Sequence, residues 1–221
     1  MLKILAKGVS VIFHPLFIIS YVLLFALLVN PYAFGFNDAK SRGLVIISVV
    51  MLSFFFPVIS ILMMKLLGLI SGFEMPDRRE RIGPIVATGI FYLWLYVNIR
   101  QHDLIPSVFS CFLLGAIIGL FAGLVLNNFS KISLHALAAG GLLAGMFLLV
   151  SHFTYPVTEI QLPLFQRSYM VRSDFFLLVV IVITGLIGSS RLFLKAHTEN
   201  ELYGGYLTGI AAQWIAFNLY F

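Results

Sequence analysis

The stretch SSRLFLKAHTENELYGGY, residues 189–206, interrupts a sequence that is otherwise almost wholly apolar on both sides. It gathers five charged or ionisable side chains within eleven residues: Arg191, Lys195, His197, Glu199 and Glu201. Apolar runs on either side of a short polar break are typical of two consecutive membrane-spanning helices. The stretch therefore predicts a helical membrane protein that concentrates polar chemistry where two helices meet.

The composition of the whole chain supports this interpretation. Of its 221 residues, 61% are hydrophobic and 10% are charged, whereas an ordinary soluble domain has roughly 25% charged residues. The net charge of +5 is small and spread along the chain, which suits anionic lipid headgroups and does not indicate nucleic acid. Cys111 is the only cysteine, which excludes an intramolecular disulfide and a cysteine-rich metal site.

A spanning helix needs about 20 apolar residues, and the chain offers six to seven such runs. We predict an all-α polytopic transmembrane bundle that forms one integral membrane domain over residues 1–221. The longest connection between runs, residues 153–172, contains Pro156 and Pro163 and is expected to cap the bundle. The predicted spans are 8–29, 44–64, 82–99, 105–126, 132–152, 175–193 and 202–221.

Three polar breaks are predicted to share one membrane face. The breaks are FEMPDRRERIG at 73–83, NNFSK at 127–131 and the stretch at 189–206, and two crossings separate each from the next. An even number of crossings returns the chain to the same side of the membrane. Two histidines, a carboxylate and several guanidinium groups are therefore expected at one mouth of the bundle.

His197 and Glu201 are four residues apart, which places them on one face of a helix beginning near residue 197. A carboxylate there can accept the imidazole N–H, fix the tautomer and favour the charged ring. His197 is thus a candidate nucleophile, and Arg191 supplies a planar fork that suits phosphate oxygens. The alternative interpretation is that such charges only anchor helices at the headgroups or fix their orientation.

SRLFLKAHTENE, residues 190–201, resembles the third signature of the type 2 phosphatidic acid phosphatase (PAP2) superfamily. That signature reads Ser-Arg, five residues, His, three residues, Asp. Ser190, Arg191 and His197 match it, and Glu201 stands in place of the Asp.

Two further stretches resemble the other PAP2 signatures, so that the resemblance lies between residues 77 and 205. In KISLH, Ser133 and His135 match the second signature, Pro-Ser-Gly-His, while Ile132 and Leu134 replace its Pro and Gly. DRRERIGP, residues 77–84, fits the first signature loosely and leaves three candidate phosphate-binding arginines: Arg78, Arg79 and Arg81.

The resemblance implies a lipid phosphatase of the bacterial inner membrane, with its site on the extracytoplasmic face. His197 would attack phosphorus and form a phosphohistidine, and His135 would protonate the leaving group and then activate water. Neither a metal nor another cofactor is required. The substrate oxygens would be bound by Ser133, Lys131, Arg191 and the arginines at 78, 79 and 81.

Several alternatives stay open at this point. A membrane prenyltransferase is a poor match because its metal–diphosphate motifs are Asp-rich, and the aspartates of this chain are isolated from one another. A non-catalytic PAP2-like phospholipid-binding protein or a small transporter is the alternative function. The substrate can be phosphatidic acid, phosphatidylglycerol phosphate, an isoprenyl phosphate or diphosphate, or lipid A, and the oligomeric state is open.

Other notable residues are interpreted as structural. His14, before Pro15, is expected to be a hydrogen-bonded histidine within the membrane, near the proposed site. His102 and His152 are expected at the opposite interface. The glycine-rich segment 138–145 is expected to let helices pack closely.

Overall fold

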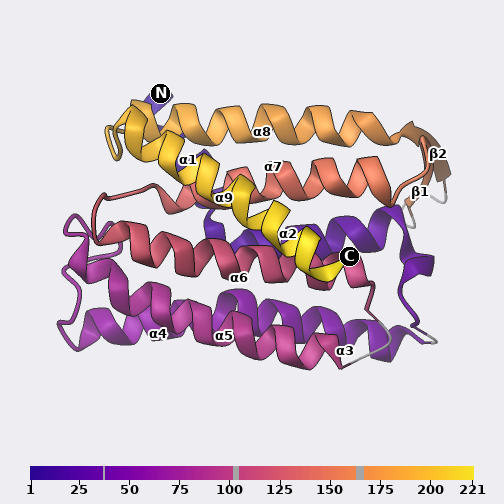
Figure 1. The fold of residues 1–221 in the computed structure, drawn as a ribbon, viewed down its shortest axis with the longest axis horizontal. Coiled ribbons are helices and arrows are strands. Elements are labelled where there is room, and N and C mark those ends of the chain that lie inside the picture. Colours follow the sequence, from indigo (N-terminus) through magenta and orange to yellow (C-terminus); the bar gives the residue numbers. More distant parts are fainter. Residues whose placement is uncertain (37, 102–104, 163–166) are drawn as a thin grey trace.

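The computed structural model describes residues 1–36, 38–101, 105–162 and 167–221. In these ranges the chain folds into a bundle of helices with one β-hairpin (Figure 1). Three short helices of other types, η1 (Pro31–Ala33), η2 (Met51–Phe55) and η3 (Arg79–Arg81), adjoin the α-helices. The α-helices are α1 (Leu2–Ile12), α2 (Pro15–Val29), α3 (Ala39–Val50), α4 (Phe56–Leu66), α5 (Ile82–Arg100), α6 (Ser107–Asn127), α7 (Leu134–His152), α8 (Ser173–Phe193) and α9 (Glu199–Tyr220).

Over the described residues, five helical segments are long and apolar enough to cross a membrane, or six if α1 and α2 form one bent span. An all-α membrane bundle therefore fits the fold. The seventh predicted span, 202–221, coincides with α9 apart from Phe221; α9 is less apolar than α6 and α7 and is not among these segments. The five segments are Ala39–Leu66, Arg79–Arg100, Ser107–Asn127, Leu134–His152 and Ser173–Phe193.

The first predicted span, residues 8–29, is not one continuous helix: the chain breaks between α1 and α2. α1 and α2 meet at a 64° bend, where His14 has an extended backbone with φ −65° and ψ 140°. Pro15 causes the break because it disfavours a helical conformation at the preceding residue and has no N–H to donate. His14 then caps α2, its Nδ1 accepting the N–H of Leu16 at 3.4 Å.

The second predicted span, 44–64, is helical throughout and is part of a longer apolar helical segment. α3, η2 and α4 form one continuous helical segment, Ala39–Leu66, in which η2 is a π-helical turn. A π turn rotates the side chains that follow it relative to a regular α-helix. Within this turn Ser53 is fully buried and shares a 3.0 Å hydrogen bond with Ser20 of α2, which ties the two spans together.

The longest connection contains a β-hairpin, an element that the all-α prediction did not include. Strands β1 (Val157–Leu162) and β2 (Arg167–Arg172) pair antiparallel, with Val157 opposite Arg172. The hairpin lies at the end of the bundle away from the three polar breaks (Figure 1), where it leads into α8. Pro163 and His102, both discussed from the sequence, lie outside the described residues.

The tightest helix contact joins α7 and α9, and glycines on both helices make it possible. α9 runs obliquely across α6 and α7 in Figure 1. A Cβ atom at Gly205 would lie 2.6 Å from the carbonyl oxygen of Ser133, and one at Gly209 would collide with the carbonyl oxygen of Leu137. The prediction that 138–145 packs closely is confirmed at Gly140, whose missing Cβ leaves room for the backbone of Tyr206.

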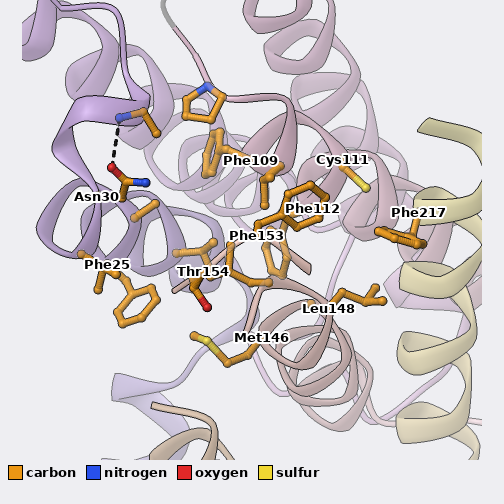
Figure 2. Close-up of a pocket in the computed structure, with 18 of the residues that line it drawn as sticks. Phe25, Asn30, Phe109, Cys111, Phe112, Met146, Leu148, Phe153, Thr154 and Phe217 are labelled. Carbon is orange, nitrogen blue, oxygen red and sulfur yellow. Dashed lines mark hydrogen bonds between the residues drawn. The ribbon is translucent and has the colours of Figure 1, made fainter. Parts of the chain in front are cut away.

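An apolar cavity of about 120 Å³ lies near the end of the bundle that carries the hairpin. Figure 2 shows aromatic rings from four segments around it, with the side chains of Asn30 and Thr154 also in its wall. Asn30 is already engaged, because its Oδ1 accepts the N–H of Ala33 at 3.2 Å. Part of the phenylalanine-rich composition therefore faces this interior space: Phe25, Phe109, Phe112, Phe153 and Phe217.

The α7–α9 contact predicts a sharp difference in stability between alanine substitutions at two glycines of α9. Gly209→Ala should destabilise the protein by roughly 1–3 kcal/mol, because the added methyl collides with rigid backbone. Gly204→Ala is the matched control, because its Cβ would meet only the side chain of Ile132 at 3.5 Å. Thermal unfolding in detergent compares them, and equal melting temperatures would contradict this account of the packing.

Candidate functional site

The three polar breaks meet at one end of the bundle, as their spacing predicted. The guanidinium of Arg78 donates to the carbonyl oxygen of Phe129 at 3.1 Å, and the amide of Asn127 donates to the carbonyl of Arg78 at 2.7 Å. The third break joins them through the backbone, where the N–H of Ser133 donates to the carbonyl of Glu201 at 3.1 Å. These bonds bring segments that are far apart in sequence into one cluster.

His197 and Glu201 form the centre of this cluster. α9 begins at Glu199, with Thr198 as its N-cap, two residues later than predicted. Nδ1 of His197 lies 3.0 Å from Oε2 of Glu201 and 3.2 Å from the carbonyl oxygen of Lys131. Both neighbours are acceptors, which requires the hydrogen on Nδ1 and leaves the lone pair on Nε2.

Glu201 also takes part in the N-terminal cap of α9, a role that was not predicted from the sequence. Its carboxylate also accepts the backbone N–H of Thr198 at 3.1 Å, while the Thr198 hydroxyl accepts the N–H of Glu201 at 3.4 Å. This reciprocal pair is a capping box at the start of α9. The same carboxylate thus orders the first turn of the helix and orients the imidazole.

Burial sets the charge of His197. The residue is only 8% exposed, and loss of hydration lowers its pKa from 6.5 to about 4. The hydrogen bond to Glu201 acts in the opposite direction, and the nearby positive charges of Arg81 and Arg191 lower the pKa again. His197 is therefore neutral at pH 7, with an unprotonated Nε2.

Two arginines stand beside this histidine without an acidic partner. Arg81 is 7% exposed and donates from Nε to the carbonyl of Met75 and from a terminal nitrogen to that of Ile132. Arg191 is half-buried, and its Nε is buried without a hydrogen-bond partner. In the described part of the chain neither arginine forms a salt bridge; Glu201 acts on Arg81, and Glu74 on Arg191, only through longer-range electrostatics.

The structure separates the three arginines of the first break. Arg81 lies within the cluster, whereas Arg78 and Arg79 are exposed. Arg78 fastens the neighbouring loop through Phe129. The backbone N–H of Arg79 is bound by the carboxylate of Asp77.

Ser133 and His135 of the second break enter the cluster with α7. Ser133 is fully buried as the N-cap of α7, and its hydroxyl accepts the N–H of Ala136 at 3.3 Å. Nε2 of His135 donates to the carbonyl oxygen of Ser10 at 3.1 Å. Lys131 is half-buried and contributes its carbonyl oxygen, which contacts His197.

Two further members, Ser10 and His14, come from the bend between α1 and α2. The Ser10 hydroxyl accepts from a terminal nitrogen of Arg191 at 3.5 Å, and its carbonyl holds His135. The ring of His14 meets that of His135 edge to face, with centroids 5.1 Å apart. The sequence feature that indicates these two members is the pair His14-Pro15 inside an apolar run. A helix break at this pair leaves backbone carbonyls and the imidazole free to bind other groups.

Comparison of the chain with protein-family models, curated proteins and solved structures gives no significant match.

The lowered pKa of His197 predicts that acid destabilises the protein through this residue. Between pH 6.5 and about 4, His197 is protonated in the unfolded chain and neutral in the folded protein. The free energy of unfolding therefore decreases as the pH falls through this range. The loss attributable to His197 is at most roughly 3 kcal/mol at pH 4.

Melting temperatures of wild type and His197→Asn, measured from pH 7 to pH 4, test this. The variant should lose less stability than wild type over that range. His152→Asn, an exposed position on the far end of α7, is the control and should follow wild type. Parallel curves for wild type and His197→Asn would refute the assignment.

Proposed function

We propose that this protein is a membrane lipid phosphatase that hydrolyses a phosphomonoester or diphosphate of a lipid through a phosphohistidine intermediate. The observation that carries the proposal is the pair Arg81 and Arg191, partly buried and without a salt-bridge partner in the described chain, beside a neutral His197. A buried cation without a counter-charge is costly. An anionic phosphate would supply the missing charge.

His197 is the proposed nucleophile. Its Nε2 carries the lone pair because Nδ1–H is engaged by Glu201 and the carbonyl of Lys131. In the first step the Nε2–P bond forms and the bond between phosphorus and the lipid oxygen breaks. Glu201 stabilises the positive charge that develops on the imidazole, as the acid of a catalytic triad does.

His135 is the proposed general acid and base. A carbonyl oxygen only accepts hydrogen bonds, so the contact with Ser10 holds a hydrogen on Nε2 of His135. The acid is therefore the imidazolium form of His135, protonated on both ring nitrogens, and its Nδ1–H gives the proton to the departing lipid oxygen. In the second step Nδ1 takes a proton from water, which attacks the phosphohistidine and releases inorganic phosphate.

The remaining residues would bind the phosphoryl oxygens. Arg81 and Arg191 offer fork-shaped donors in a poorly hydrated site, where charge stabilisation is strong. The Ser133 hydroxyl and the Lys131 ammonium complete the set, and we favour Arg81 over Arg78 and Arg79 because of its burial. Since the arginines meet the developing charge, no metal is part of the proposal.

The resemblance to PAP2 signatures points to the same roles and to the bacterial inner membrane, with the site facing outwards. The second candidate function is a non-catalytic protein that binds lipid phosphates. Two observations favour it: Ile132 and Leu134 replace the Pro and Gly of the second signature, and Ser10 already occupies Nε2 of His135.

Three variants assayed on two substrates separate these roles. His197→Ala should abolish turnover of both a lipid phosphate and p-nitrophenyl phosphate, because the covalent route is lost. His135→Ala should lose about 10²–10⁴-fold on the lipid phosphate and much less on the aryl ester, whose leaving group needs little protonation. Glu201→Gln should fall between them, because it keeps a hydrogen bond and loses the charge.

His152→Ala, at the opposite end of α7, is the matched control and should keep wild-type turnover. Near wild-type rates for His197→Ala would exclude the phosphohistidine route. Equal losses on both substrates for His135→Ala would remove its assignment as acid. Phosphate-lipid binding without any phosphate release by wild type would favour the non-catalytic candidate.

A further inference from the structure

A second recess lies between α8 and α9, apart from the histidine cluster. In Figure 1, α8 ends and α9 begins at the end that carries the polar breaks, and the two helices diverge from there, each in contact with α7. A cavity of about 440 Å³ occupies the space between them, and Leu143 of α7 lines its floor. Its walls are formed by Thr184, Gly185, Gly188, Ser189 and Leu192 of α8, and Glu199, Leu202, Tyr203, Tyr206 and Ile210 of α9. We call it the α8–α9 groove.

The lower part of the groove suits an aliphatic chain. Its wall there combines Leu143 and Ile210 with the bare backbone of Gly185. A Cβ atom at Gly185 would have no neighbour within 4 Å, so the space beside this glycine is open. The groove lies between two helices that would face the bilayer. An acyl chain of a neighbouring lipid can therefore enter it and fill the apolar space.

A polar group with an unmet hydrogen bond also lines the groove. Thr184 is 7% exposed, and its hydroxyl is buried without a partner. The usual acceptor for a helical threonine is a carbonyl of the preceding turn, but that bond is not formed here. A buried hydroxyl without a partner costs free energy, so Thr184 points to a ligand that brings an acceptor such as an ester carbonyl.

The charge at the mouth of the groove favours one kind of lipid headgroup. Glu199 is the only charged residue among those that line the groove, and it is exposed at the start of α9. Arg191, next to Leu192 on α8, does not line the groove and contacts Ser10 of α1 instead. An acidic mouth repels an anionic headgroup and attracts an ammonium.

The depth of the groove fits a glycerophospholipid. Thr184 and Leu192 are eight residues apart on α8, which corresponds to about 12 Å along the axis. Leu192, near the end of α8, and Glu199, at the start of α9, both line the groove. An ethanolamine headgroup and the glycerol ester carbonyls of one lipid are separated by a span of this order.

We propose that the α8–α9 groove binds one phospholipid with a primary-amine headgroup, of the phosphatidylethanolamine class. Its ammonium pairs with Glu199, an ester carbonyl accepts from the Thr184 hydroxyl, and one acyl chain lies against Gly185. This site does not depend on the proposed phosphatase activity, because none of its residues belongs to the histidine cluster.

Fluorescence quenching by brominated lipids tests the proposal. The reporter is Tyr203→Trp in a background with Trp94→Phe and Trp214→Phe, so that the only indole lies in the groove. The protein is reconstituted in dioleoylphosphatidylcholine with increasing amounts of phosphatidylethanolamine or phosphatidylglycerol that carry the same brominated chains. We expect phosphatidylethanolamine to bind roughly two- to fivefold more strongly, the range of an exposed ion pair.

Two variants locate the effect. Glu199→Gln should bring the preference close to one without changing the shape of the groove. Gly185→Leu should fill the groove and weaken quenching by both lipids, whereas Gly43→Leu, another helical glycine with open space around it, should leave quenching unchanged. Equal quenching by the two lipids in the parent protein, or an unchanged preference in Glu199→Gln, would overturn the proposal.

Discussion

The close contact between α7 and α9 is the constraint on which the polar cluster depends. Because Gly205 and Gly209 have no side chain, the backbone of α9 lies directly against the first turns of α7. That approach allows the N–H of Ser133 to donate to the carbonyl of Glu201. The start of α7, which carries His135, and the start of α9, which follows His197, are thereby held in one layer. Larger residues at these glycines would separate the two histidines.

The layer concentrates positive charge in a place with little water. Arg81 and Arg191 hydrogen-bond to carbonyl and hydroxyl oxygens, and within the described residues neither forms a salt bridge with a carboxylate. Electrostatic interactions strengthen as the local dielectric constant falls, so an anion entering this layer would be bound strongly. The same burial keeps His197 neutral by lowering its pKa, which is the state a nucleophile requires. Exclusion of water therefore has two effects: it strengthens anion binding by Arg81 and Arg191, and it keeps the imidazole of His197 neutral.

The membrane pattern made the broad arrangement predictable. Apolar runs of helix-spanning length fix where the polar breaks fall, and counting crossings brings those breaks to one end. The four-residue spacing of His197 and Glu201 likewise predicts their contact, because residues four apart adjoin on a helix.

Features that depend on tertiary contacts were beyond sequence reasoning. Pro15 in the sequence indicates a helix break, but it does not show which groups contact His135. Those contacts depend on how α1 packs against α8. The choice of Arg81 over Arg78 and Arg79 depends on which side of a short 3₁₀ turn faces the bundle. In the hairpin strands, 157–162 and 167–172, apolar residues do not alternate regularly with polar ones, so the sequence does not distinguish them from an irregular loop. Pairing between its strands, which are joined by a short connection, decided its structure.

The central claim is that Nε2 of His197 becomes covalently bound to phosphorus. The most direct measurement is peptide mass spectrometry of wild-type protein that has been quenched in alkali during turnover of an aryl phosphate, since phosphohistidine survives alkali and is lost in acid. The account predicts one phosphate on His197, with more accumulating in His135→Ala because water is no longer activated, and none in His197→Asn. Continuing release of phosphate with no phosphorylated histidine, or with the phosphate on another residue, would contradict it.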